Sequence, residues 1–370
     1  MARGCGAAGS AGRITIVAAV GVAGLVAACG GGSTAGRSGT PSPSSTASAP
    51  TPPVLNLKPL LSGLLDRNGV PPAAYVTSLG GFVVQAPWSD LQRSAGAPLA
   101  ADNAIDGAIS TVRALNATYH IDLGLKIRVL TGTSAPAWAK NLGGPPIPLL
   151  NPQNGAEGTI GRFWTDAFGT AYDQFERLLA TRYDSVPEVR EVTISRCTTF
   201  YDEPFILDTG YQPNDTALLS AGFTVAADEN CQRQEIDANT VWQHTHSDLA
   251  LNPYQVVNSA GFNRTDEPFT ESMMMYCRHV LGNACVLENN SLRSPAQPGY
   301  LAMYASMHAL GQPIAFQTAT LSRIGSLDDT LAYAISLGAN SVELPGGYEA
   351  LGTPATFAST TRALAANPLG

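Results

Sequence analysis

Charged side chains are scarce in this sequence, and basic ones are scarcer than acidic ones. Only 14% of the 370 residues are charged, and 21 basic residues against 29 acidic ones give a formal charge of −8. A sequence-wide attraction to phosphate backbones is therefore absent, which makes nucleic acid a poor partner. The hydrophobic share of 44%, by contrast, suffices for one large globular domain or two ordinary ones and excludes a wholly disordered chain.

Motifs that would indicate several other chemistries are also missing. Without a Gly-x-Ser-x-Gly elbow, a serine hydrolase mechanism lacks its usual turn. No phosphate-binding glycine fingerprint follows the first strand, and we expect no cofactor. Paired Cys-x-x-Cys spacing is absent. His244 and His246 would point to different faces of a predicted helix around Trp242, so we expect no metal site.

The first residues have the pattern of an export signal. Arg3 and Arg13 precede an uncharged run, Ile14 to Ala28, which is too short to span a bilayer comfortably. The run ends in Val26-Ala27-Ala28-Cys29, which resembles a bacterial lipobox. This resemblance implies that residues 1–28 are removed and that acyl chains on Cys29 hold the protein on the outer face of the cell membrane. A plain signal peptide with an incidental cysteine is the alternative.

A tether is predicted to follow Cys29. Residues 30–53 are almost entirely Gly, Ser, Thr, Ala and Pro, with a single charge at Arg37. Such a segment buries too little apolar surface to offset the entropy of ordering it. We therefore expect a lipid-anchored linker over 29–53 and one folded domain over 54–370, a size that is ordinary for a single barrel.

Four cysteines lie in the predicted folded domain, and an even number fits an oxidising compartment. Four cysteines allow three pairings. We predict the local ones, Cys197 with Cys231 and Cys277 with Cys285, because short loops bring partners together most often.

Short apolar runs alternate with helix-period segments, which predicts parallel strands. The last four runs begin about 30 residues apart, the length of one strand-helix unit. The seven runs start at Phe82, Ile127, Val192, Tyr254, Cys285, Ile314 and Ser341. An eighth strand, expected near Ala73 to Val76, would close a (β/α)8 TIM-like barrel. An open, doubly wound sheet is the alternative.

In such barrels the active site lies at the carboxyl ends of the strands. Trp88 and Trp138 follow two predicted strands, where a flat ring can stack on the apolar face of a sugar or on another planar group; ordinary core or rim packing is the alternative. Glu203 follows another strand beside aromatic residues, and partial desolvation would raise its pKa toward that of a general acid. A solvated loop position is the alternative. Arg128, inside an apolar strand, is either a buried partner for a carboxylate or a substrate clamp.

The order of these elements over roughly 120 residues resembles the second to fourth units of clan A (β/α)8 glycoside hydrolases. The resemblance implies that Glu203 is the acid/base residue. It also exposes a departure, because Gln317 stands on strand seven where the family has its nucleophilic glutamate. Glu288 after strand six or Glu343 in strand eight could supply the second carboxylate, and Asn289 and Gln317 could bind substrate. Two carboxyls about 5–5.5 Å apart would give retention, and about 6.5–9.5 Å inversion.

These patterns leave three hypotheses open. The first is an extracytoplasmic, lipid-anchored glycoside hydrolase. The second is a barrel that has lost the chemistry, which Gln317 favours, and that binds carbohydrate or a cell-envelope partner without turnover. The third, a two-lobed solute-binding lipoprotein, is disfavoured by the even strand spacing. The predicted partners are a carbohydrate and the membrane, and a monomer is expected.

Overall fold

The computed structural model describes residues 56–260 and 263–367 of the chain. The predicted signal, the lipid site Cys29 and the linker 29–53 lie outside the described residues. Within the described ranges, no helix is both long enough and apolar enough to cross a bilayer.

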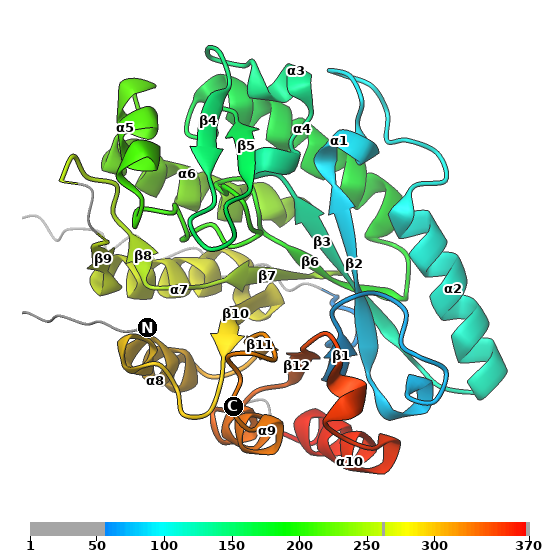
Figure 1. Ribbon diagram of the computed structural model, residues 1–370. Helices are drawn as coiled ribbons and strands as arrows, with labels where there is room; N and C mark the ends of the chain where they lie inside the picture. Colours follow the sequence, from blue (N-terminus) through cyan, green and yellow to red (C-terminus); the bar gives the residue numbers. More distant parts are fainter. Residues whose placement is uncertain (1–55, 261–262, 368–370) are drawn as a thin grey trace, which may run out of the picture. The chain divides into compact units, whose positions relative to one another are not determined.

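Eight parallel strands form a closed barrel (Figure 1), which confirms the predicted (β/α)8 architecture. Around the ring the order is β1, β12, β11, β10, β7, β6, β3 and β2, so β1 closes the barrel against both β12 and β2. The strands are β1 Gly63–Asp66, β2 Gly81–Pro87, β3 Gly124–Leu130, β6 Val189–Thr193, β7 His246–Ala250, β10 Cys285–Leu292, β11 Ile314–Thr318 and β12 Ser341–Leu344.

Helices surround the strands on the outside of the barrel (Figure 1). The larger ones are α2 Ala104–Tyr119, α4 Asp166–Tyr183, α5 Gln212–Ser220, α6 Val225–Ala238, α7 Glu267–Leu281, α8 Leu301–Leu310, α9 Leu327–Ser336 and α10 Pro354–Ala365. Shorter elements occupy the loops: α1 Trp88–Leu91, α3 Ala137–Lys140, the hairpin of β4 Ile147–Leu150 with β5 Glu157–Ile160, and the hairpin of β8 Tyr254–Gln255 with β9 Thr265–Asp266.

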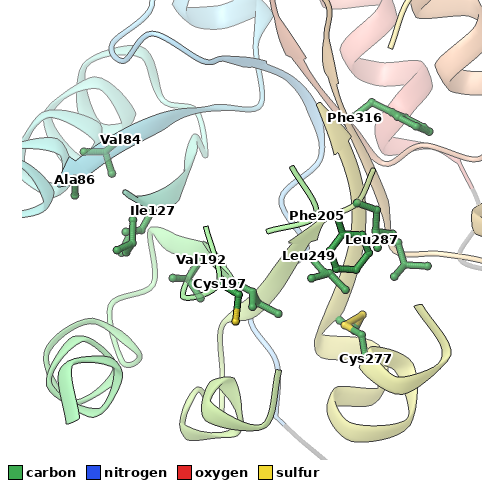
Figure 2. Close-up of a cluster of buried hydrophobic side chains, with 14 of the residues drawn as sticks. Val84, Ala86, Ile127, Val192, Cys197, Phe205, Leu249, Cys277, Leu287 and Phe316 are labelled. Atoms are coloured by element: carbon green, nitrogen blue, oxygen red, sulfur yellow. A yellow bond between two sulfur atoms is a disulfide. The ribbon is translucent and has the colours of Figure 1, made fainter. Parts of the chain in front are cut away.

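The apolar core lies between the strands and the helices. Successive residues of a strand point to opposite faces of the sheet, so every second residue can face the helices. These positions are apolar and buried, as Figure 2 shows for Val84, Ile127, Val192, Leu249, Leu287 and Phe316. The intervening positions face the barrel lumen, and many of them are charged.

Two predicted strands are placed differently by the structure. The first strand is Gly63–Asp66, whereas Ala73 to Val76 forms a turn that enters a short 3₁₀ helix, Val76–Ser78. The fifth barrel strand is His246–Ala250, and the expected run from Tyr254 enters the small β8–β9 hairpin. His246 therefore begins a strand and is not in a helix with Trp242. The physical reason is that β7 carries Asp248 toward the lumen, which hides the strand from a search for apolar runs.

Helix α10 covers the seam where the first and last strands meet. Thr361 of α10 accepts a hydrogen bond from the Leu64 backbone N–H at 3.2 Å and donates one to the Ser78 carbonyl at 2.7 Å. Gly63 has a φ of +91°, and a Cβ at this position would lie only 2.5 Å from the Thr361 methyl group. Glycine at position 63 is thus required by both the backbone conformation and the close approach of α10.

Both predicted disulfides are present. Cys197–Cys231 links the segment after β6 to α6, and Cys277–Cys285 links α7 to the start of β10. The preference for local pairings is confirmed.

Candidate functional site

A single lysine holds four carboxylates inside the barrel. Lys126 of β3 lies within 3.2 Å of carboxylate oxygens on four other strands: Glu191 of β6, Asp248 of β7, Glu288 of β10 and Glu343 of β12. These side chains are at most 1% exposed. We call these five residues the lumen cluster.

The lumen cluster sets the protonation of its members. Burial alone would lower the pKa of Lys126, but the four acids around it raise that pKa well above its ordinary value. Burial and the neighbouring Asp248 raise the pKa of Glu288 well above its usual range. Burial also opposes the charge of Glu343, yet Arg128 and Lys126 together hold its pKa at about 2. Glu343 is therefore a carboxylate in the folded protein, whereas burial and Asp248 favour the protonated form of Glu288.

Arg128 connects the lumen cluster to the carboxyl ends of the strands. Its Nη2 donates to both Glu343 oxygens at 2.8 and 2.9 Å, and its Nε lies 2.6 Å from Asp202 Oδ2. Its Nη1 donates to Gln317 Oε1 at 3.1 Å. Of the two predicted roles for Arg128, the structure places it in that of a buried partner for carboxylates.

Above these ion pairs a cavity of about 570 Å³ opens at the carboxyl ends of the strands. Its wall is rich in amides, hydroxyls and phenols, the groups that pair with the hydroxyls of a polar ligand. They include Gln153, Tyr201, Asn252, Gln255, Asn263, Asn290, Ser291, Gln297, Tyr300, Gln317 and Thr320. The charged lining residues are Arg67, Glu203, Asp208, Glu267, Arg293 and Arg323.

Glu203, the acid that follows β6, lies in the cavity wall. It is 8% exposed, and its Oε1 accepts a hydrogen bond from Asn252 Nδ2 at 3.0 Å. Burial, reinforced by the charge of Asp202, raises the pKa of Glu203 to about 8. Its carboxyl is therefore largely protonated at pH 7, the state that a general acid requires.

The two candidates for a second carboxylate lie elsewhere. Glu288 and Glu343 are members of the lumen cluster and do not line the cavity. Gln317, which the resemblance led us to expect where the glycoside hydrolases have a nucleophile, does line the cavity. Its Oε1 accepts from Arg128, and its Nε2 donates to the Asn290 carbonyl at 3.4 Å. The structure thus brings Glu203 together with an amide at this position.

The predicted sugar-stacking residues occupy the core or its edge. Trp88 is fully buried; its ring stacks on Phe175 at 5.0 Å, and its Nε1 donates to Gln92 Oε1. Trp138 packs edge-on against Trp88 at 5.5 Å. Neither ring lines the cavity. Asn289 is also fully buried, donating to the Leu251 carbonyl and accepting from the Tyr304 hydroxyl. These three positions correct the expectation of substrate contact, because their side chains face the helices.

Asn290 is a cavity residue that the sequence pattern did not reveal. It is 7% exposed and lines the cavity, yet neither its side-chain oxygen nor its nitrogen has a hydrogen-bond partner among the described residues. The strand period was the available signal: Glu288 faces the lumen, so position 290 does as well, and position 289 faces outward. Arg67 was missed because the first strand was placed too late in the chain.

The described residues hold no group of three or more His, Cys, Asp or Glu side chains that could bind a metal ion. The fold and the site together define a (β/α)8 barrel with an ion-paired lumen and a polar cavity at its carboxyl-terminal mouth. No family model and no curated protein sequence matches the chain.

Solved structures of similar fold include the catalytic domain of a beta-amylase from Paenibacillus polymyxa. It is 8% identical with a TM-score of 0.48, and the match covers 76% of this chain and 91% of the other. Endo-glycoceramidase II from Rhodococcus sp., in a ganglioside GM3 complex, is 13% identical with a TM-score of 0.47, over 84% of this chain and 81% of the other. Morphinone reductase in complex with tetrahydroNAD is 14% identical with a TM-score of 0.41, over 84% of this chain and 93% of the other. Each likeness extends to the fold alone.

The buried acids predict that the protein is more stable in mild acid than in mild base. Burial raises the pKa to about 7 for Glu176, Glu191 and Asp228, and to about 8 for Glu203 and Glu235. Each raised pKa contributes stability that is fully present below the unfolded value near 4 and is lost as the pH rises through 7 to 8. Between pH 5.5 and pH 8 we therefore expect the melting temperature to fall by at least about 2 °C.

Three other shifted groups do not reverse this expectation. The pKa of Glu343, about 2, affects stability only in stronger acid, and the pKa of Lys58, about 8, only above pH 8. Burial lowers the pKa of His246, which opposes the trend at the acidic end, but one imidazole acts against five acids. Glu176→Gln, which can still accept from Trp242 Nε1, should reduce the pH dependence. A melting temperature that is flat or rises toward pH 8 would contradict the expectation.

Proposed function

We propose that this chain is a lipid-anchored, extracytoplasmic barrel that binds carbohydrate in the cavity beside Glu203 without hydrolysing it. The observation that carries the proposal is Gln317. This amide occupies the strand position from which a second carboxylate would face the cavity, and Arg128 holds it there at 3.1 Å. The location on the outer membrane face rests on the Val26 to Cys29 pattern.

The cavity wall supports a polyhydroxyl ligand. A side-chain amide offers both a donor and an acceptor, which matches a sugar hydroxyl that can also donate and accept. Asn290 presents such an amide with both atoms unpartnered, and leaving buried polar atoms without partners is unfavourable. Tyr300, half-buried in the same wall, offers a ring face for stacking on a sugar.

Hydrolysis is the second candidate, and one observation favours it. Glu203 is protonated near neutral pH because its pKa is raised to about 8, so it could protonate a leaving oxygen. The carboxylates that could serve as nucleophile or base on neighbouring strands, Glu288 and Glu343, are engaged by Lys126 beneath the cavity. A second acid would have to come from the rim, where Asp208 and Glu267 lie.

A glycan-binding screen run beside a broad panel of aryl glycosides tests the proposal. We expect binding without turnover, and we expect Asn290→Ala to weaken binding of the best glycan by about 10-fold, because a ligand hydroxyl loses its partner. The fold should tolerate this change, since the Asn290 side chain has no partner among the described residues. Asn141→Ala, at an exposed position outside the cavity, is the matched control.

Turnover of any aryl glycoside that falls by about 100-fold or more in Glu203→Gln would establish the hydrolase instead. Absence of glycan binding, with the protein folded, would reject the carbohydrate function.

A further inference from the structure

Three arginines line the cavity without a carboxylate partner. Arg67, Arg293 and Arg323 form no ion pair with any carboxylate of residues 56–260 or 263–367, whereas Arg113, Arg182 and Arg190 each pair with one. The chain as a whole carries an excess of acid, with a formal charge of −8. Three guanidinium groups around one cavity therefore concentrate positive charge at a single place on an acidic protein.

The acids in the same wall offset this charge only in part. Glu203 is largely protonated near pH 7, and the buried Asp208 is occupied by the Thr199 hydroxyl at 2.9 Å. Glu267 lies at the exposed start of α7, where the Thr265 hydroxyl donates to it. Near neutral pH, three cations thus face two carboxylates, and each of these already has a donor of its own.

Arg67 is the arginine best placed to hold a ligand. It follows β1, and its half-buried guanidinium reaches past β12 to the Thr318 carbonyl of β11, to which Nη1 donates at 3.0 Å. Only this one of the five guanidinium N–H groups has an acceptor among the described residues. The bond to Thr318 orients the guanidinium and leaves the other donors free for a bidentate contact.

The unpartnered amide of Asn290 lines the same cavity as this guanidinium. Gln317 precedes Thr318 in β11 and donates to the Asn290 carbonyl on the adjacent strand β10, so the two groups flank β11 at the barrel mouth. An amide and a free guanidinium on either side of one strand can bind a hydroxyl and an oxyanion of the same molecule.

From this arrangement, and resting on the proposed function, we propose that the cavity selects an acidic carbohydrate. Arg67 binds the carboxylate, sulfate or phosphate group of the ligand, while Asn290 pairs with a hydroxyl of the same ligand. Arg293 and Arg323 add positive charge around the site. All three anionic groups present two oxygens to a planar guanidinium, which is the geometry that arginine recognises.

Calorimetric binding to matched trisaccharides tests this selectivity. The neutral probe is a galactose trimer, and the acidic probes are a galacturonic acid trimer and galactose trimers bearing a sulfate or a phosphate ester. We expect the wild-type protein to bind at least one acidic probe about 10-fold or more tightly than the neutral one. The preference should shrink as salt increases, because ions screen partly exposed charges. Equal affinity for neutral and acidic probes would overturn the inference.

Arg67→Gln separates the anion contact from general binding. We expect it to weaken binding of the acidic probe by about 10-fold and to leave the neutral probe within about twofold. Arg93→Gln, at an exposed position outside the cavity, should change neither. Unchanged affinity of Arg67→Gln for the acidic probe, with the folded state verified by its melting temperature, would overturn the inference while leaving carbohydrate binding intact.

Titrating inorganic sulfate and phosphate alone distinguishes an oxyanion site from the carbohydrate function. Arg67-dependent binding of either anion, with no trisaccharide bound, would support the oxyanion site and reject the carbohydrate function. If none of the trisaccharides or anions binds the folded protein, both proposals fail.

Discussion

Replacing Lys126 with methionine should destabilise this protein severely. The substitution leaves Glu191, Asp248, Glu288 and Glu343 in the lumen without the cation they share. Removing one partner of a buried ion pair costs about 3–5 kcal/mol, and here a single lysine serves four acids. We expect the melting temperature to fall by at least about 6 °C, or the folded protein to be lost. Thermal and urea unfolding, followed by circular dichroism, measure the change.

Lys140→Met is the matched control. Its ammonium group donates to one backbone carbonyl, that of Thr133, and forms no ion pair with a carboxylate of the described residues. The expected loss there is about 1 kcal/mol. Adding Asp248→Asn and Glu288→Gln to Lys126→Met should recover part of the stability, because neutral groups need no cation. A Lys126→Met protein as stable as the wild type would show that the lumen cluster does not depend on its lysine.

Trp88→Ala should also destabilise the protein strongly, although less than Lys126→Met. The ring is fully buried, stacks on Phe175 and makes edge-on contacts with Trp138, Phe168 and Tyr172. Deleting a buried aromatic side chain costs about 3–5 kcal/mol through lost burial and the cavity left behind. The change also removes the donor to Gln92, leaving a buried amide oxygen unpaired. Urea unfolding monitored by circular dichroism gives the difference.

Trp88→Phe distinguishes a core residue from a ligand-stacking one. It keeps an aromatic ring in the core and should lose less stability than Trp88→Ala. If Trp88 serves only the core, glycan affinity should stay within about twofold of the wild type. A loss of glycan affinity in Trp88→Phe without a matching loss of stability would instead restore the stacking role expected from its place after β2.

The barrel was predictable from sequence because its outward faces follow a simple rule. Residues such as Val84, Ile127 and Leu287 recur on strands separated by one strand-helix unit, and their burial against helices requires apolar side chains. The residues that face the lumen follow no such apolar pattern. Strand β7 was misplaced because Asp248 interrupts its apolar pattern. The ion-pair partner of this acid is Lys126 on β3, 122 residues earlier in the chain. A pairing over that distance is not visible in a local window.

The candidate site was predictable to the level of two residues, one after β6 and one on β11. Glu203 was found because it follows a recognisable strand, and the cavity position of Gln317 follows from the same counting. Glu288 and Glu343 were harder to place, because their role depends on depth along the barrel axis. Both acids lie within their strands and contact Lys126, whereas Glu203 lies past the end of β6 and reaches the cavity. Depth can be judged only when strand ends are known to within a residue or two.

The α10 seam also constrains how the polypeptide reaches its native state. Strand β1 pairs with β12, with Gly63 opposite Ser341. Thr361 of α10 forms hydrogen bonds with both Leu64 and Ser78. Contacts between such distant segments raise the contact order, and the chain entropy lost in closing long loops slows their formation. During synthesis, the edge of β1 that pairs with β12 stays uncovered until almost the entire remaining polypeptide has emerged. A chain released before Ser341 would lack β12 and leave the second edge of β1 unpaired, and an unpaired strand edge can pair with another chain.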